Sequence, residues 1–356
     1  MIVLDSHCDT PSQLLRLRDI SIDNIHGHVD IPKLRRGGVD ASFFALYTPA
    51  TMEPDAATRY AMQMLAATKD AVEANPADLA LAYSAAEIEA NKAKGLISIL
   101  LGMENGSPIQ KSLPLLREFY RMGVRYMTLT HNGDNEIADA ASHGTRWHGL
   151  SPFGREVVAE MNRIGMLIDV AHCSDETFYD CIRYSEKPIV STHSCCRALA
   201  GHRRNMTDDM IRKMADKGGV IQINFYPVFL SDDFARKFDD INAEHPEYDA
   251  ADKAFRENPA DPDIRMEYFR VMEELKTYCR PGVESVVDHI DHAVKVGGID
   301  HVGIGTDFDG IEVPPFGLDD VSCLGLVFDE MSRRGYSSSE IEKVAGANFM
   351  RVLSEA

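Results

Sequence analysis

The sequence predicts an α/β fold of the (β/α)8, or TIM-type, barrel class, and three observations support this prediction. Eight strand-sized apolar segments run along the 356 residues, and helix-length segments separate most of them, which is typical of parallel α/β folds. No break in composition and no internal repeat marks a boundary, so we expect a single domain over residues 1–356. Polar candidates fall at the C-terminal ends of the expected strands, where barrels of this class carry their reactive groups.

The expected strands are short apolar runs bounded by polar residues or glycines. Residues 95–106, GLISILLGMENG, form the longest continuous run, as in a strand that is covered on both faces. The last strand contains Gly303 and Gly305 at inward parity, which leaves room beside a bulky neighbour. The eight expected strands are residues 2–7, 39–47, 96–103, 124–130, 166–171, 188–193, 220–226 and 301–306.

Helix-length segments follow most of these strands. Ser84 and Glu87 have the spacing of a capping box, as do Ser337 and Glu340 near the C-terminus. The second pair indicates a C-terminal closing helix. Helices are expected at about residues 55–75, 84–94, 111–122, 151–165, 206–219, 265–279 and 282–297, with another between the two strands at 166–171 and 188–193.

Two segments depart from the simple alternation. Residues 132–149 are rich in Gly, Asn and Asp and hold the only tryptophan, so we expect a long loop over the strand ends. Residues 231–265 contain eleven acidic residues, five basic residues and three prolines. We expect this segment to form an exposed helical excursion rather than a domain, and an excursion of this kind can cover the site.

Charge and hydropathy exclude several classes of partner. The net charge of −19 argues against a nucleic-acid or anionic-membrane partner. The longest apolar runs are far shorter than the roughly 20 residues that span a bilayer. The first residues, MIVLDSHCDTP, lack a basic start followed by an apolar stretch, so we expect no secretory signal. The seven cysteines form no CxxC pair, and their odd number fits reduced thiols in the cytoplasm.

Seven side chains mark the C-terminal ends of the expected strands. A single histidine at a strand end is as often a hydrogen-bonded structural residue as a ligand, an H-x-D pair is common, and a lone glutamate can cap a helix or pair with arginine. Seven such coincidences are harder to attribute to packing, which would place apolar residues there. The seven are His7, Asp9, Glu104, His131, His172, His193 and Asp307.

This set suits a pair of metal ions. Imidazole and carboxylate ligands without thiolate fit zinc or manganese. A catalytic zinc needs three protein ligands, so the set is too large for one ion. Two ions about 3.5–4 Å apart, sharing one carboxylate and one bridging hydroxide, would use all of it. Such a hydroxide is available near pH ~7 because zinc lowers the pKa of bound water.

Seven motifs, in order along nearly the whole chain, resemble those of the renal (membrane) dipeptidase family, a branch of the amidohydrolase-type barrels. The motifs are DSHCDTP, GMENG, LTHNGDN, LIDVAHCS, STHS, RRN-x-x-DD and VGIGTDFDG. The resemblance implies two zinc ions per chain, one held by His7, Asp9 and Glu104 and the other by Glu104, His172 and His193, with Glu104 bridging.

The resemblance also implies a reaction and three further roles. The reaction is hydrolysis of free dipeptides, including those with a C-terminal D-residue. His131 would contact the region of the scissile carbonyl, and Asp307 would shuttle the proton from the hydroxide to the leaving amine. Arg204 would bind the α-carboxylate of the substrate, although Arg203 beside it leaves that assignment open by one position.

Two other interpretations stay open. Another barrel amidohydrolase could act on a lactone, a cyclic amide or an N-acyl amino acid; no strand-end lysine is present to carry a bridging carbamate, and Glu104 takes that place. A catalytically silent binding barrel would be expected to have lost part of the ligand set, and none is missing. We therefore expect small dipeptides as partners; a homodimer is compatible with the sequence.

Overall fold

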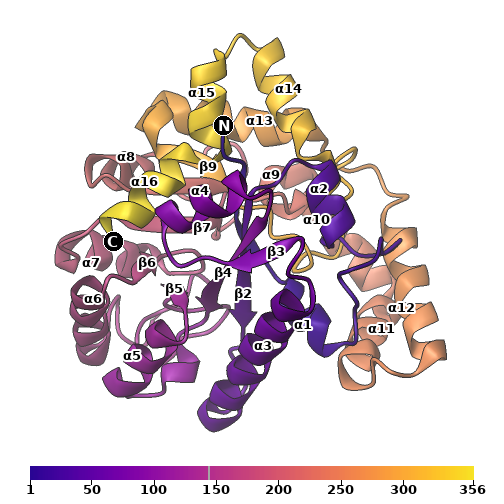
Figure 1. Ribbon diagram of the computed structural model, residues 1–356, viewed down its shortest axis with the longest axis horizontal. Helices are drawn as coiled ribbons and strands as arrows, with labels where there is room; N and C mark the ends of the chain where they lie inside the picture. The colour runs from indigo at the N-terminus through magenta and orange to yellow at the C-terminus, as the bar shows by residue number, and fades with distance from the viewer. Residues whose placement is uncertain (143–144) are drawn as a thin grey trace.

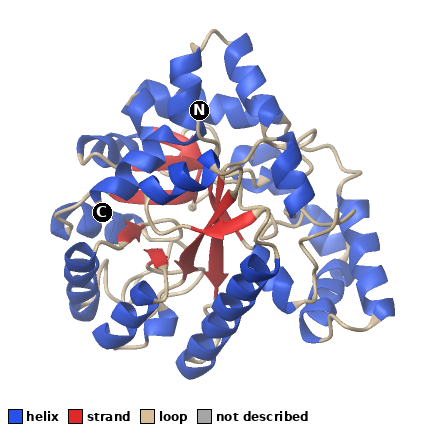
Figure 2. Ribbon diagram, viewed as in Figure 1, coloured by secondary structure: helices blue, strands red, loops and turns tan. Residues whose placement is uncertain are grey.

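A computed structural model describes residues 1–142 and 145–356, so residues 143 and 144 of the expected 132–149 loop lie outside the described residues. The described chain forms a nearly closed barrel of parallel strands with helices around it, which confirms the predicted fold class (Figures 1 and 2). The strands are β1 (Leu4–Cys8), β2 (Ala41–Tyr47), β3 (Leu79–Leu81), β4 (Ile97–Glu104), β5 (Val124–Thr128), β6 (Leu167–Asp169), β7 (Ile189–Ser194), β8 (Val220–Ile223) and β9 (Val302–Ile304).

Eight of these strands follow one another around the barrel in the order β1-β2-β4-β5-β6-β7-β8-β9. The first and last strands approach each other just beyond β9. There the Asp307 N–H donates to the His7 carbonyl over 3.0 Å, and the Asp9 N–H donates to the Phe308 carbonyl over 2.8 Å. These two bonds bring His7 and Asp9 beside Asp307, the candidate that follows β9.

The short strand β3 is not among the eight expected strands. It pairs with the first half of β4, from Ile97 to Ile99, on the edge whose second half, from Leu101 to Glu104, pairs with β5. Three residues carry too little periodicity to reveal a strand in the sequence. Because β3 lies at the N-terminal end of β4, it does not reach the end that carries Glu104.

Several strands end earlier than the sequence predicts. Strand β6 ends at Asp169, before the expected end at residue 171, and β9 ends at Ile304, before residue 306. The backbone then turns: His172 has φ 66° and Asp307 has φ 62°, in the left-handed region. A residue in that conformation cannot continue a strand. The turn instead directs these two side chains over the barrel mouth.

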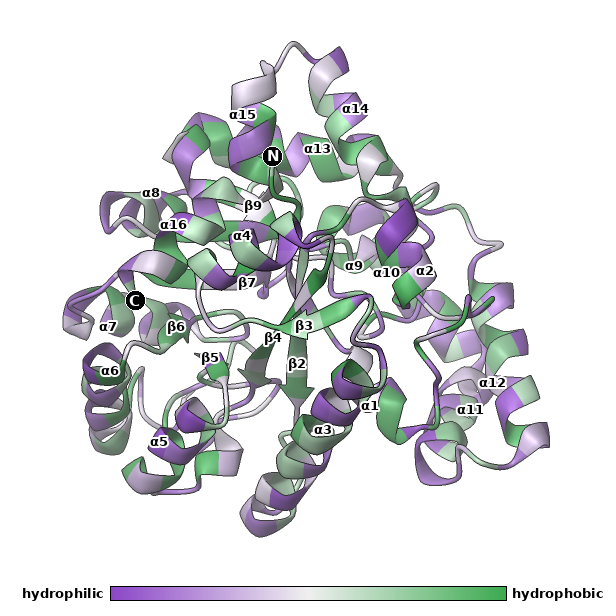
Figure 3. Ribbon diagram, viewed as in Figure 1, coloured by the Kyte–Doolittle hydropathy of each residue, from purple (hydrophilic) through white to green (hydrophobic). Residues whose placement is uncertain are grey.

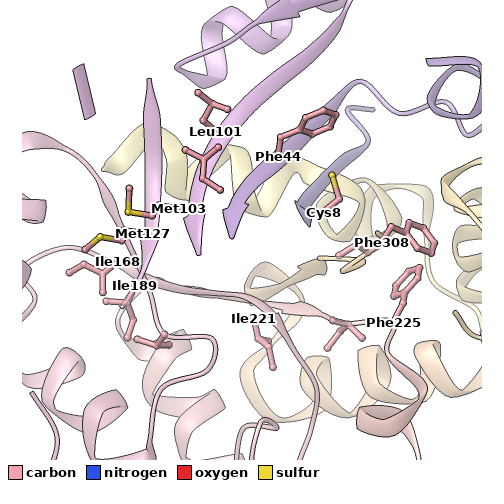
Figure 4. Close-up of a cluster of buried hydrophobic side chains, with 14 of the residues drawn as sticks. Cys8, Phe44, Leu101, Met103, Met127, Ile168, Ile189, Ile221, Phe225 and Phe308 are labelled. Atoms are coloured by element: carbon pink, nitrogen blue, oxygen red, sulfur yellow. The ribbon is translucent and has the colours of Figure 1, made fainter. Parts of the chain in front are cut away.

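The helices pack around the strands through an apolar layer. Outward-facing side chains such as Phe44, Leu101, Met127 and Ile189 lie fully buried in this layer (Figure 4). The helices outside the excursion are α1 (Thr10–Leu15), α2 (Ile31–Arg36), α3 (Pro54–Ala74), α4 (Ala85–Ala93), α5 (Leu113–Arg121), α6 (Pro152–Ile164), α7 (Asp175–Tyr184), α8 (Asp208–Asp216), α9 (Pro227–Leu230), α13 (Val283–Gly297), α14 (Gly325–Arg333), α15 (Ser338–Glu342) and α16 (Asn348–Glu355).

The C-terminal tail closes the opposite end of the barrel. The predicted capping box is present, since Ser337 and Glu340 bond each other's backbone N–H groups at the start of α15. A wide turn over residues 343–347 then leads to α16. Phe349 and Leu353 of α16 pack with Leu4 and Val220 from the barrel floor. The expected single closing helix is thus two helices separated by a turn.

The helical excursion consists of α10 (Asp232–Glu244), α11 (Pro246–Glu257) and α12 (Pro262–Leu275), and lies at one side of the barrel (Figure 1). We use the name excursion for residues 231–275. It includes α12, which the sequence analysis separates from it. Phe234, Phe238, Tyr248 and Val271 form a small apolar cluster inside it. Its outer faces are largely hydrophilic (Figure 3).

Among the described residues, no helix combines the length and the apolar character that a membrane crossing requires.

Candidate metal centre and substrate cavity

The structure brings the seven predicted strand-end residues together at one mouth of the barrel. We call them the strand-end cluster: His7, Asp9, Glu104, His131, His172, His193 and Asp307. Three overlapping groups within it have ligand atoms that all lie within 4.8 Å of one another. Four of the seven lie within or directly after strands β1, β4 and β7. The other three follow β5, β6 and β9 by three residues each.

Glu104 lies at the centre of the cluster, and its two oxygens face different partners. Oε2 is 3.6 Å from Nε2 of His7. Oε1 is 2.9 Å from Nε2 of His172 and 3.4 Å from Nε2 of His193. A carboxylate with one oxygen toward each set of donors has the arrangement that a bridging ligand needs.

The other side of the cluster is rich in carboxylates. Nε2 of His7 is 3.5 Å from Oδ2 of Asp9 and 3.9 Å from Oδ1 of Asp307. Gly310 lets these two carboxylates come close, because a Cβ at that position would lie 2.0 Å from Oδ2 of Asp9 and 2.7 Å from Oδ1 of Asp307. Any side chain at residue 310 would therefore displace both.

Each of the three cluster histidines that face Glu104 has a hydrogen-bond partner for its other ring nitrogen. Nδ1 of His172 lies 3.0 Å from the amide oxygen of Asn132, which only accepts. Nδ1 of His193 bonds the hydroxyl of Thr192 over 2.9 Å. Nδ1 of His7 bonds the hydroxyl of Tyr126 over 2.9 Å. The Asn132 oxygen places the proton of neutral His172 on Nδ1, so its Nε2 presents a lone pair to the centre, and the same tautomer of His7 and His193 would present two more.

Burial decides the protonation of several cluster residues. It lowers the pKa of His172 and His193 well below the ordinary histidine value, so both rings are neutral. It lowers the pKa of His131 to about 4 and raises the pKa of Asp9 to about 6. Burial also raises the pKa of Asp307 well above its usual range. Although burial opposes it, the carboxylates of Glu104 and Asp9 raise the pKa of His7 well above the ordinary histidine value, so this ring alone supplies positive charge where the carboxylates crowd together.

Unpartnered buried atoms in the cluster indicate that it fits divalent metal ions. Nε2 of His7 and Oδ1 of Asp9 are buried and have no hydrogen-bond partner among the described residues. Nε2 of His172 and Nε2 of His193 lie 2.9 Å apart, and with both ring protons on Nδ1 their lone pairs would face each other. Buried polar atoms without partners are costly. Cations between these lone pairs would satisfy all of them, and the nitrogen and oxygen donors suit zinc.

A cavity of about 450 Å3 opens above the cluster. Arg204 lines it and is itself buried. Its Nη2 donates to the His193 carbonyl over 3.2 Å, while its Nε is buried and has no partner in the described chain. Arg203, by contrast, is exposed and does not line this cavity. The geometry therefore places the second arginine of the pair, and not the first, over the cluster.

The excursion supplies one wall of this cavity. Phe238 of α10, Arg256 of α11 and Tyr268 of α12 all line it, opposite the strand ends. Nε of Arg256 lies 2.6 Å from Oδ2 of Asp252, one turn earlier on the same helix. The excursion is thus not merely an exposed appendage, because it faces the site.

Four residues that hold the cluster in place were not predicted from the sequence. Asn224 donates to Oδ2 of Asp307 over 2.9 Å, and Tyr126, Asn132 and Thr192 bond the histidines as described above. A polar residue at the end of the apolar run VIQIN was a usable signal for Asn224. Tyr126 carried no such signal, because an aromatic residue inside a strand is ordinary.

Comparisons with known proteins agree with this geometry. A family model described as membrane dipeptidase (peptidase family M19) matches residues 1–356. An uncharacterized dipeptidase of Schizosaccharomyces pombe, C3A11.10c, is 32% identical over 370 residues, covering 98% of this chain and 80% of the yeast protein.

Two solved structures are similar over the whole chain. The probable dipeptidase PvdM from Pseudomonas aeruginosa has a TM-score of 0.84 and 28% identity, covering 100% of this chain and 95% of its own. A metallo peptidase from Rhodobacter sphaeroides, liganded with a phosphinate mimic of the dipeptide L-Ala-D-Ala, has a TM-score of 0.81 and 25% identity, covering 100% and 99%. The chain therefore belongs to the membrane dipeptidase family, peptidase family M19, and is a metallo-dipeptidase.

Proposed function

We propose that this protein hydrolyses the peptide bond of free dipeptides with two zinc ions held by the strand-end cluster. His7, Asp9 and Glu104 would hold one ion, and Glu104, His172 and His193 the other. When bound, the two ions would supply a nucleophilic hydroxide at neutral pH and polarise the peptide carbonyl. The observation that carries this proposal is the orientation of the Glu104 carboxylate. One of its oxygens faces His7 and the other faces His172.

Arg204 would fix the length of the substrate. Its buried, unpartnered Nε and its place in the cavity lining leave a guanidinium edge free for a carboxylate. A carboxylate one residue beyond the scissile bond is the C-terminus of a dipeptide. The Rhodobacter sphaeroides protein is liganded with a mimic of L-Ala-D-Ala, which supports a C-terminal D-residue as an accepted substrate here.

Asp307 and His131 would handle the proton and the carbonyl. The raised pKa of Asp307, due to burial, suits a group that accepts a proton and then passes it to the leaving amine. Asn224 holds its other oxygen and so aims the carboxylate. His131, neutral because burial lowers its pKa to about 4, can donate an N–H bond to the carbonyl oxygen.

The test combines metal analysis with a substrate panel. Protein purified without chelator should contain about two zinc ions per chain, and should cleave L,L- and L,D-dipeptides but not lactones, cyclic amides or N-acyl amino acids. One zinc or none would refute the paired centre. Cleavage of the second group alone would favour the other amidohydrolase interpretation.

The role of Asp307 has its own test. The variant Asp307→Asn should keep both zinc ions and lose about 100- to 10,000-fold in kcat, the range for a general acid–base group. Retained turnover would remove Asp307 from the proton path.

We also propose a cytoplasmic location, which is supported by seven cysteines that are all free thiols.

A further inference from the structure

A buried carboxylate outside the cluster, Asp169, lies at the end of β6 and accepts four hydrogen bonds. Its Oδ1 accepts from the backbone N–H of Thr192 over 2.9 Å and of Ala171 over 3.0 Å. Its Oδ2 accepts from the hydroxyls of Thr192, over 2.7 Å, and Thr128. Four donors fill the acceptor sites of a carboxylate, so Asp169 has no capacity to donate.

This arrangement determines the direction of the next bond. The single hydroxyl proton of Thr192 goes to Asp169, so its oxygen is left to accept from Nδ1–H of His193. All three residues are fully or almost fully buried, which excludes water as a competing partner. The chain Asp169, Thr192, His193 therefore fixes the His193 tautomer whose Nε2 carries a lone pair.

We propose that Asp169 is a positioning residue that acts through the Thr192 hydroxyl to keep His193 in its metal-binding tautomer. The inference rests on the proposed metal centre at His193. It predicts that the charge of Asp169 matters less than its inability to donate. An amide at this position would carry an NH2 group, which donates. Facing the Thr192 hydroxyl, it would reverse the direction of the hydrogen bond between residue 169 and Thr192.

The variant Asp169→Asn should change the tautomer of His193. Two of the four donors are backbone N–H groups, which cannot turn away, so the oxygen of the introduced amide must face them and its NH2 group must face the hydroxyls. Thr192 would then accept from that NH2 group and donate to Nδ1 of His193. The histidine proton would move to Nε2, which then has no lone pair for a metal. A similar tautomer effect is known where an orienting aspartate is replaced by asparagine in serine proteases.

Thr128 provides a matched control. Its hydroxyl donates to the same Oδ2 of Asp169 from the neighbouring strand β5, but it does not bond His193. The variants Thr128→Val and Thr192→Val each remove one hydroxyl bond to Asp169 and replace threonine with a residue of nearly the same shape. Only the second breaks the connection to the metal-binding ring.

The experiment measures zinc affinity with a competing chelator, together with urea unfolding to show that each variant is folded. Thr192→Val should weaken one of two zinc sites about tenfold, and Asp169→Asn about 100-fold, the range for residues behind a ligand. Thr128→Val should leave both sites unchanged. The double variant D169N/T192V should bind zinc more tightly than D169N alone. Without the Thr192 hydroxyl, nothing donates to Nδ1 of His193, so the ring is no longer held in the tautomer with its proton on Nε2.

The outcomes separate the inference from the proposed function. Equal zinc affinity in Thr192→Val and Thr128→Val, or a further loss in the double variant, would overturn the relay. If D169N does not fold, the comparison of the two valine variants still decides. If the unmodified protein takes up no zinc, the metal centre itself fails. Two tight sites in the unmodified protein with no effect of Thr192→Val would refute the relay alone.

Discussion

The strand-end cluster and the excursion face the same cavity but are built differently. In the cluster, each of His7, His172 and His193 is buried and bonds a partner from the chain. The excursion is joined mainly by pairs within its own helices, such as Arg236 with Asp233 and Arg270 with Glu274. The cluster is therefore overdetermined by its surroundings, whereas the excursion wall depends on a small local core.

This difference indicates that the strand-end cluster and the excursion have different roles. Atoms that hold metal ions must stay within a few tenths of an ångström, and buried, fully bonded side chains provide that precision. A wall that meets variable substrate side chains can be half-exposed and adjustable. We expect changes in the cluster to affect metal content and rate strongly, and changes in the excursion to affect substrate choice mildly.

The largest effect is expected for Glu104→Gln. The amide keeps the shape but removes the charge and one acceptor oxygen, so both metal sites lose their shared ligand. Zinc content should fall from about two to below one per chain, and kcat/KM should fall at least about 1,000-fold, equivalent to the several kcal/mol that the metal centre supplies. The control Glu160→Gln alters a buried carboxylate on α6 that pairs with Arg117 and Arg163. It should keep zinc and activity, and equal losses in both variants would show a folding defect instead.

Arg204→Ala should affect substrate binding rather than metal content. Loss of a charged hydrogen-bonding group costs about 1.5–3 kcal/mol, so KM for free dipeptides should rise roughly 10- to 100-fold. Dipeptide amides, which lack the carboxylate, should change far less. Arg203→Ala is the matched control and should leave both substrates unchanged. If Arg204→Ala raises KM equally for acids and amides, the residue is structural.

The junction between the two regions predicts an acid sensitivity. His289 of α13 accepts from the Cys196 N–H over 3.0 Å and bonds the Leu230 carbonyl over 3.2 Å, at the entry to the excursion. Burial lowers its pKa from 6.5 to about 4. Below pH 6.5 His289 is protonated in the unfolded chain, whereas in the folded protein it stays neutral down to about pH 4. The free energy of unfolding therefore falls as the pH falls toward 4.

Between pH ~7 and pH ~5 this histidine should contribute a loss of about 2 kcal/mol in the free energy of unfolding. Urea unfolding at the two pH values measures the loss, and His289→Gln should reduce the pH dependence by that amount. An identical pH dependence in the unmodified protein and His289→Gln would contradict the prediction.

The smallest effect is expected for Arg256→Ala. The side chain is 48% exposed and pairs with Asp252, and exposed ion pairs contribute about 0–1 kcal/mol. Stability and zinc content should hardly change, while the ratio of kcat/KM between two dipeptides should shift by up to about fivefold. Arg236→Ala, which breaks a similar pair outside the cavity lining, should shift neither. A large loss of zinc in Arg256→Ala would erase the distinction between the two regions.

The sequence by itself determined the fold class and the candidate ligands. Strand-sized apolar runs that end in His7, Glu104 and His193 predict both the barrel and the edge on which these side chains meet, because parallel strands share one C-terminal edge. The period of two in H-x-D also predicts that His7 and Asp9 share a face. These are local properties, so a linear pattern records them.

Only the tertiary structure decided how the site is oriented and enclosed. The bond from the Thr192 hydroxyl to Asp169 joins two strands, and the bond between Tyr126 and His7 spans 119 residues. The turn that brings Arg204, rather than Arg203, into the cavity depends on packing around it. The excursion reaches the cavity because its own apolar cluster folds it back. Such contacts depend on distances between segments far apart in the chain, which composition and periodicity do not encode.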